Sequence, residues 1–212
     1  MASGCGLPGG ESALKAKVCG LTTPEDVAMV LAAGADFLGF LSHAASPRHC
    51  PDPRLPALAG DRAVLVAVVE DAAELAAWAK ACGATWVQPY LPDRRGLDLL
   101  RARGLRILLP WPDEPGQEPA QADLFLWESS PAATGVLGGS GQGHGLAHPP
   151  PGPFLLGGGL HGPVLRERYA ALSRHLDCRG FDAASRLEHS PGRKHPELVA
   201  AFVRAAHFLE MP

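Results

Sequence analysis

The sequence predicts an α/β fold in which eight parallel strands alternate with helices in one domain. The chain has 212 residues, a length that fits a single domain. Short β-type runs alternate with Ala/Leu-rich stretches almost from end to end, and no break between domains interrupts them. Eight units in 212 residues give about 26 residues per unit, the size of a compact barrel unit. The alternation is also compatible with an open doubly wound sheet, and periodicity alone leaves both architectures open.

Eight short runs are predicted to be the strands. They are Ala16–Cys19, Phe37–Leu41, Val64–Val69, Trp86–Gln88, Arg106–Leu109, Leu124–Trp127, Phe154–Leu156 and Gly180–Ala184.

Helix signals lie between several of these runs. Thr23 precedes a proline at the first helical position, and acidic residues follow in the first turn. Gly34 and Gly83 stand where glycines end helices. The later units are weaker, because Trp111–Ala120 is rich in proline and Ser129–Pro153 is a long Gly/Pro segment. A segment of that length after the sixth strand is usually functional or disordered.

Composition excludes several classes of function. The net charge of −3 gives no electrostatic reason to bind nucleic acid or an anionic membrane, so we expect neither partner. The start of the chain lacks the features of a signal peptide, and Asp36 interrupts the longest apolar stretch. The five cysteines show no CxxC or other metal-ligand spacing. We therefore expect reduced thiols, no metal and a cytoplasmic protein.

Five segments in order carry chemical information. They are Lys17-Val18-Cys19-Gly20-Leu21-Thr22; Gly39-Phe40 with Ser46-Pro47-Arg48; Gly138-Gly139-Ser140-Gly141-Gln142; Gly157-Gly158-Gly159-Leu160; and Asp182-Ala183-Ala184-Ser185-Arg186-Leu187-Glu188 before Ser190-Pro191-Gly192. The ordered set resembles the phosphoribosylanthranilate isomerase family over roughly 15–207. The resemblance implies a single (β/α)8 TIM barrel over residues 15–212, after a flexible N-terminal extension of residues 1–14.

The resemblance also implies an activity. Members of this family carry out the Amadori rearrangement of N-(5′-phosphoribosyl)anthranilate to 1-(2-carboxyphenylamino)-1-deoxyribulose 5-phosphate in tryptophan biosynthesis, without a cofactor. A general acid protonates the furanose ring oxygen and a general base removes the C2′ proton. The expected partner is therefore this small phosphorylated sugar-anthranilate substrate, bound by a monomer or a homodimer.

Two residues match the family's catalytic pair. Cys19, at the end of the first predicted strand, matches the base; a thiol acts as a base only as thiolate, so a lowered pKa is expected. Glu128, after the sixth strand, stands where the family has an aspartate as acid and is one methylene longer. The competing interpretations are a small buried apolar side chain for Cys19 and a solvated loop-edge acid for Glu128.

The other matches concern substrate binding. Arg48 offers a planar fork for the anthranilate carboxylate, unless it is a surface arginine. Asp182 is expected on the amine side of the substrate, unless it is a structural acid inside the barrel. In many barrels, glycines after the last strands bind phosphate through their backbone N–H groups. We expect the same of the glycines here, unless they form a simple flexible turn. The residues expected at the phosphate are Gly139, Gly141, Gly157, Gly158, Gly159, Ser185 and Arg186.

Three departures from the family pattern leave alternatives open. Gln88-Pro89-Tyr90-Leu91 replaces the family's Gln-Leu-His-Gly, so the histidine is absent. Arg186 replaces a glycine after the eighth strand, and Gln142 replaces a common lysine. A non-catalytic or divergent phosphosugar-binding barrel, or an isomerase or lyase for another phosphosugar, therefore remains an alternative.

The remaining candidate residues are expected to be passive. The histidines show no ligand spacing, and Trp78 and Tyr169 are predicted to pack in the core from helices. We expect loop or helix positions without a chemical role for Cys50, Cys82 and Cys178.

Overall fold

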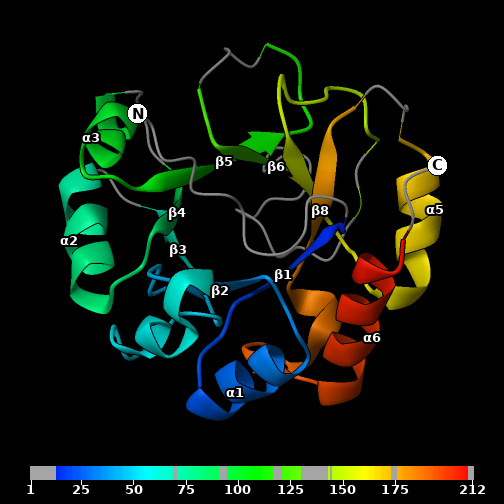
Figure 1. Ribbon diagram of the computed structural model, residues 1–212, viewed down its shortest axis with the longest axis horizontal. Helices are drawn as coiled ribbons and strands as arrows, with labels where there is room; N and C mark the ends of the chain where they lie inside the picture. The colour runs from blue at the N-terminus through cyan, green and yellow to red at the C-terminus, as the bar shows by residue number, and fades with distance from the viewer. Residues whose placement is uncertain are drawn as a thin grey trace.

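Eight parallel strands close into a barrel in chain order, with β8 pairing back onto β1 (Figure 1). The computed structural model describes residues 13–68, 71–90, 95–116, 121–129, 143, 145–172 and 176–209. The barrel strands are β1 (Lys15–Cys19), β2 (Phe37–Leu41), β3 (Ala63–Val68), β4 (Trp86–Tyr90), β5 (Arg106–Pro112), β6 (Leu124–Glu128), β7 (Phe154–Leu156) and β8 (Cys178–Ala183). The predicted barrel is confirmed, and the open doubly wound sheet is wrong.

The strand boundaries differ from the prediction mainly at the ends. The predicted limits of β2 and β7 are met, whereas β5 continues three residues further, to Pro112. The expectation of a loop or helix position is wrong for Cys178, because this residue begins β8 and pairs with Phe154.

The helices lie around the outside of the strands (Figure 1). They are α1 (Pro24–Ala32), the 3-10 helix η1 (Leu55–Arg62), α2 (Ala72–Cys82), α3 (Arg95–Ala102), the 3-10 helix η2 (Gly162–Val164), α5 (Leu165–Ala170) and α6 (Pro196–His207). Thr23 caps α1 as predicted, because its side chain accepts a hydrogen bond from the backbone N–H of Asp26 at 3.2 Å. Gly83 ends α2 with a left-handed φ of 73°, which favours glycine.

A short segment after β8, absent from the prediction, adds a small hairpin. It consists of the 3-10 helix η3 (Ser185–Leu187) and the antiparallel strands β9 (Glu188–Ser190) and β10 (Arg193–Lys194). The hydroxyl of Thr22 donates to the carbonyl of Gly192 at 2.6 Å, which joins the hairpin to the segment after β1. The hairpin is therefore held beside the end of β1.

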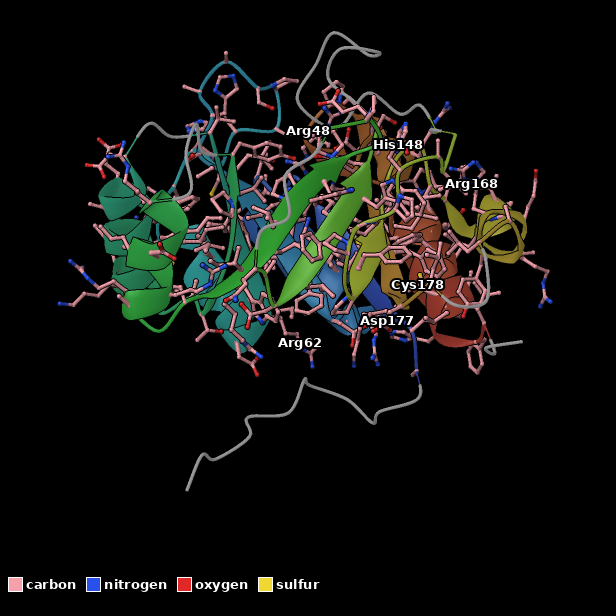
Figure 2. All side chains as sticks on the ribbon, turned by 90° about the horizontal axis from the view of Figure 1, so that it is seen from above. Arg48, Arg62, His148, Arg168, Asp177 and Cys178 are labelled. Carbon is pink, nitrogen blue, oxygen red and sulfur yellow. The ribbon has the colours of Figure 1, made fainter. Side chains whose placement is uncertain are left out.

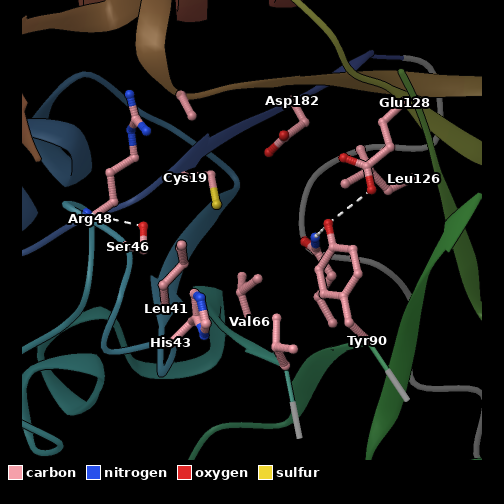
Figure 3. Close-up of a pocket in the computed structure, with 13 residues that line it drawn as sticks. Cys19, Leu41, His43, Ser46, Arg48, Val66, Tyr90, Leu126, Glu128 and Asp182 are labelled. Carbon is pink, nitrogen blue, oxygen red and sulfur yellow. Dashed lines mark hydrogen bonds between the residues drawn. The ribbon is translucent and has the colours of Figure 1, made fainter. Parts of the chain in front are cut away.

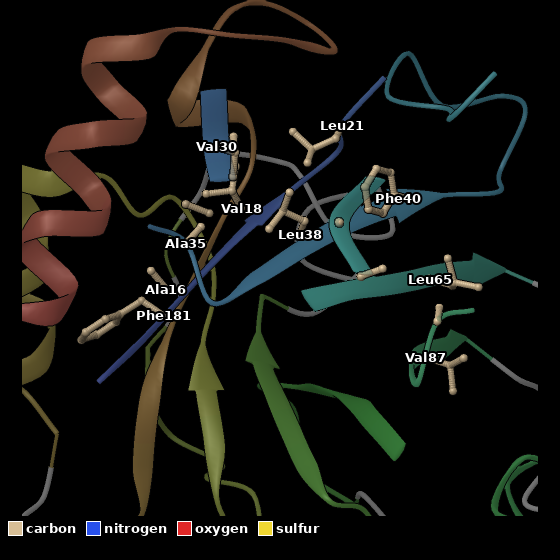
Figure 4. Close-up of a cluster of buried hydrophobic side chains, with 14 of the residues drawn as sticks. Ala16, Val18, Leu21, Val30, Ala35, Leu38, Phe40, Leu65, Val87 and Phe181 are labelled. Atoms are coloured by element: carbon tan, nitrogen blue, oxygen red, sulfur yellow. The ribbon is translucent and has the colours of Figure 1, made fainter. Parts of the chain in front are cut away.

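The core has two layers, because side chains of a strand alternate between its two faces. Figure 4 shows the outer layer, in which Ala16 and Val18 of β1 pack with Val30 and Ala35. The helical Trp78 and Tyr169 pack against this layer, as predicted. The inner layer consists of Phe37, Val64, Trp86, Leu108, Leu124, Leu126 and Leu155. Lys17 and Cys19 alternate with Ala16 and Val18, so they lie on the inner side.

Candidate active site

A pocket at the carboxyl end of the barrel strands collects four of the predicted site residues (Figure 3). Figure 2 places Arg48 at this end, and Arg62, which precedes β3, at the other. Active sites of (β/α)8 barrels lie at the carboxyl end. The lining residues are Cys19, Leu41, His43, Ser46, Arg48, Val66, Val68, Gln88, Tyr90, Leu126, Glu128, Asp182 and Ala184.

Cys19 is the last residue of β1 and is buried, with 8% of its surface exposed. It pairs with Gly39 of β2, where a Cβ would lie 2.7 Å from the Cys19 Sγ, so a glycine is needed beside the thiol. Burial raises the pKa of the thiol, and the positive charges of Lys17 and Lys194 only partly offset this effect. The expected lowering of the Cys19 pKa is therefore wrong.

Lys17 lies inside the barrel and is fully buried. Its Nζ donates to Asp182 Oδ1 at 2.6 Å, and its positive charge lowers the pKa of the nearby Cys19 thiol. Burial alone lowers the pKa of Lys17, but the charges of Asp182 and Cys19 outweigh burial and raise it, so the ammonium stays charged. Asp182 thus belongs to an ion pair inside the barrel and also lines the pocket, while its contact with the amine side of the substrate stays a prediction. Lys17 belongs to the first of the five motifs, but the sequence alone predicts no role for it.

Glu128 is the last residue of β6, and its side chain is buried at the pocket. Burial raises the pKa of its carboxyl to about 7, although a hydrogen bond from Tyr90 works in the opposite direction. The solvated loop-edge interpretation is therefore wrong. A carboxyl that is half protonated near neutral pH can donate a proton to a substrate.

Tyr90, the last residue of β4, reaches Glu128 across the pocket (Figure 3). Its hydroxyl donates to Glu128 Oε1 at 2.8 Å and accepts a hydrogen bond from Gln88 Nε2 at 3.1 Å. Burial and the nearby carboxylate raise the pKa of Tyr90 well above its ordinary value, so the phenol stays protonated and remains a donor. In the sequence Tyr90 is noticeable only as the absence of a histidine, and no sequence signal links it to Glu128.

Arg48 lines the pocket, but its guanidinium is already bound to a carboxylate. Its Nε lies 2.9 Å from Glu188 Oε1 and its Nη2 lies 2.9 Å from Glu188 Oε2. Glu188 also accepts a hydrogen bond from the buried Lys194 Nζ at 2.7 Å. The surface-arginine interpretation is wrong, since only 15% of the Arg48 side chain is exposed. Its binding of a substrate carboxylate stays a prediction, and such a ligand would have to share the guanidinium with Glu188.

The expected phosphate-binding residues that the structure describes are not among the residues that line this pocket. Gly157–Gly159 directly follow β7, and Gly158 and Gly159 have left-handed φ values of 90° and 66° that favour glycine. Ser185 and the exposed Arg186 begin η3, which is separated from the end of β8 by one residue. Gly139 and Gly141 lie outside the described residues. The phosphate site therefore stays a prediction.

Neither a cluster of metal ligands nor a membrane-spanning helix occurs in the described part of the chain. No group of three or more His, Cys, Asp or Glu side chains there could hold a metal ion. None of the helices described has the length and apolar composition needed to cross a membrane.

Comparisons with known proteins point to one family. No protein-family model matches the chain. The N-(5′-phosphoribosyl)anthranilate isomerase of Parvibaculum lavamentivorans is 32% identical over 91% of this chain and 98% of its own. That of Azorhizobium caulinodans is 36% identical over 93% of both.

Solved structures show the same likeness. The structure of TrpF from Jonesia denitrificans is 27% identical and has a TM-score of 0.73, over 92% of this chain and 97% of its own. The phosphoribosyl anthranilate isomerase of Thermus thermophilus has a TM-score of 0.71 at 22% identity, over 91% of this chain and 98% of its own, and supports the fold.

Proposed function

The chain belongs to the N-(5′-phosphoribosyl)anthranilate isomerase family, and from that premise we propose how its own residues perform the Amadori rearrangement of N-(5′-phosphoribosyl)anthranilate. The product is 1-(2-carboxyphenylamino)-1-deoxyribulose 5-phosphate, and the reaction belongs to tryptophan biosynthesis in the cytoplasm. One observation carries the proposal. A thiol on β1 and a carboxyl on β6 line the same pocket, and the carboxyl has a pKa of about 7.

The first step in this proposal is ring opening. Glu128 donates its proton to the furanose ring oxygen, the C1′–O bond breaks, and the nitrogen lone pair forms an iminium at C1′. A carboxyl with a pKa of about 7 is still largely protonated at slightly acidic pH. Burial favours the neutral acid, which is the form that this step consumes.

The second step is the removal of the C2′ proton. The Cys19 thiolate takes this proton, and the C–H electron pair neutralises the iminium to give an enolamine, which tautomerises to the ketose. Burial of Cys19 opposes the thiolate, while Lys17 and Lys194 favour it. The active form therefore combines an ionised Cys19 with a protonated Glu128 and is a minority species near neutral pH.

The remaining residues bind and orient the substrate in this proposal. Asp182 faces the amine side of the sugar, and Arg48 faces the anthranilate carboxylate. In this proposal the phosphate accepts hydrogen bonds from the backbone N–H groups of Gly157–Gly159. Ser185, Arg186 and the glycine segment that contains Gly139 and Gly141 also bind it. The protein is proposed to work as a monomer or a homodimer.

The experiment is to follow the anthranilate-type fluorescence of the substrate in the presence of pure protein. We expect turnover by the parent and none by Cys19→Ala or Glu128→Gln, with product-analogue affinity largely kept in the cysteine variant. Glu128→Asp should keep activity, because the carboxyl is retained. Tyr169→Phe is a control, since Tyr169 lies outside the pocket and packs against Phe181. Binding of the product analogue without turnover by the parent would favour a non-catalytic barrel instead.

A further inference from the structure

We propose that Tyr90 is a positioning residue that holds the longer side chain of Glu128 in place for proton donation. This inference rests on the proposed role of Glu128 as the general acid. It concerns two residues on strands that are not neighbours in the sheet, since β5 lies between β4 and β6. The phenol thus bridges two strand ends that the backbone does not join directly.

Three polar side chains form a directed chain of hydrogen bonds. Gln88 Nε2 donates to the Tyr90 hydroxyl at 3.1 Å, and that hydroxyl donates to Glu128 Oε1 at 2.8 Å. Gln88 lies within β4 and is only 2% exposed, so water does not compete for the hydrogen bond that its amide donates. With its oxygen accepting from Gln88, the hydroxyl has its one hydrogen left for Glu128.

The contact determines which oxygen of Glu128 delivers the proton. Oε1 is engaged by Tyr90, so the transferable proton belongs on Oε2. This arrangement holds in both protonation states, since Oε1 accepts from the phenol whether or not Oε2 carries a proton. Glutamate has one more rotatable bond than aspartate, and a carboxyl at its end therefore needs an external partner to keep one position.

Two departures from the family pattern meet in this contact. Glu128 stands where the family has aspartate, and Tyr90 stands where the family has histidine. The two residues are 38 positions apart in the chain, yet their side chains are hydrogen-bonded. The longer side chain of Glu128 is hydrogen-bonded to Tyr90, so the two substitutions together keep a positioned carboxyl at the place of the family's acid.

The test is a double-mutant cycle of kcat and KM with Tyr90→Phe, Glu128→Asp and the combined variant. Tyr90→Phe removes one oxygen and keeps the ring. We expect kcat to fall about tenfold with KM changed less than about twofold, because a misplaced acid affects the transition state more than binding. In the Glu128→Asp background the shorter side chain no longer reaches the phenol, so Tyr90→Phe should cost less than about twofold there. The matched control is Tyr169→Phe, the same change at the other of the two tyrosines, with kcat like that of the parent.

A second measurement does not depend on turnover. The Glu128 carboxyl can be titrated through its infrared carbonyl band, assigned by the loss of that band in Glu128→Gln. We expect Tyr90→Phe to raise the pKa of Glu128 above about 7, because a donor to the carboxylate is lost. The other groups facing this carboxyl are Lys17 and Cys19 of β1 and Asp182 of β8, and the variant leaves all three in place.

The outcomes separate the two proposals. Absence of turnover by the parent overturns the proposed function, whereas an unchanged carboxyl titration in Tyr90→Phe overturns this inference whatever the activity. Equal losses of kcat in both backgrounds also overturn it, since Tyr90 would then act independently of Glu128. A rise in KM at constant kcat would assign Tyr90 to substrate binding instead.

Discussion

Gly39 is the residue whose substitution should disturb the proposed base most directly. It lies opposite Cys19 in the β1–β2 register, and its own φ is not in the left-handed region, so an alanine adds no backbone strain. The alanine methyl group would lie 2.7 Å from Cys19 Sγ, 3.1 Å from Cys19 Cβ and 3.0 Å from Cys19 Cα. Rotation of the thiol alone cannot relieve the last two overlaps, because they involve Cβ and the backbone.

The size of the effect follows from these distances. Ordinary van der Waals separation begins at 3.4 Å, so Sγ must move by about 3.4 − 2.7 = 0.7 Å and the backbone at Cys19 must move away by about 3.4 − 3.0 = 0.4 Å. A misplacement of about 1 Å at a reacting group can cost about 100-fold in rate, so we expect Gly39→Ala to lower kcat by about 10- to 100-fold. Overpacking of a core costs about 1–3 kcal/mol, which lowers Tm by about 2–12 °C in a domain of this size.

The assay combines steady-state turnover of the fluorescent substrate with thermal unfolding of the same preparation. Gly145→Ala is the matched control, because its added Cβ would lie 3.8 Å from Asp113 Oδ2, an ordinary separation. The control should keep kcat within about twofold of the parent. A folded Gly39→Ala protein with the parent's kcat would refute the reasoning, since Cys19 could then move without consequence and would not be the base.

Three further predictions concern the charges around the site. The active form needs a protonated Glu128, whose pKa is about 7, and an ionised Cys19, whose pKa burial raises above 9.0. We therefore expect kcat/KM to rise up to a pH of about 7, to stay level above it, and to fall only above the pKa of Cys19. A pH–rate profile that falls from below pH 7 would contradict this order. Lys17→Met breaks a buried ion pair and should lower the unfolding free energy by about 3–5 kcal/mol in chemical denaturation. Adding Asp182→Asn should recover part of this loss, and a double variant as unstable as the single one would count against the pair. Arg186→Gly should weaken the binding of a phosphorylated product analogue, measured by calorimetry, about tenfold, and this difference should become smaller at high salt. Tighter binding by the glycine variant would show that Arg186 obstructs the phosphate.

The fold was predictable where apolar runs and helix-capping residues mark the same elements. Apolar runs located all eight barrel strands, and the Thr23 cap and Gly83 marked helix ends that the structure confirms. Periodicity could not distinguish the barrel from an open sheet, and the ordered motifs made that choice. The end of β4 was placed too early, at Gln88, although Pro89 pairs in register with Ala67 and the strand continues to Tyr90. A proline usually marks a strand end because it lacks a backbone donor.

The site was predictable only as a set of positions. Cys19, Arg48, Glu128 and Asp182 line one pocket because strand ends of a barrel converge, so motif matches at those ends were sufficient to find them. Their partners were not predictable, because contacts such as Arg48 with Glu188 join residues 140 positions apart. The charge state of each group depends on burial, which no local pattern contains.

Burial helps the proposed acid and hinders the proposed base, and this contrast explains the buried lysines. It raises the pKa of Glu128 to about 7 and so favours the protonated form that ring opening needs. It raises the pKa of Cys19 as well, and so disfavours the thiolate that the next step needs. A pocket dry enough to keep the acid protonated therefore needs positive charge near the thiol, and Lys17 and Lys194 both lower the pKa of Cys19 from inside the protein. Asp182 keeps Lys17 charged, whereas burial lowers the pKa of Lys194 and its ion pair with Glu188 opposes that lowering, so both carboxylates favour the charges that help to ionise the base.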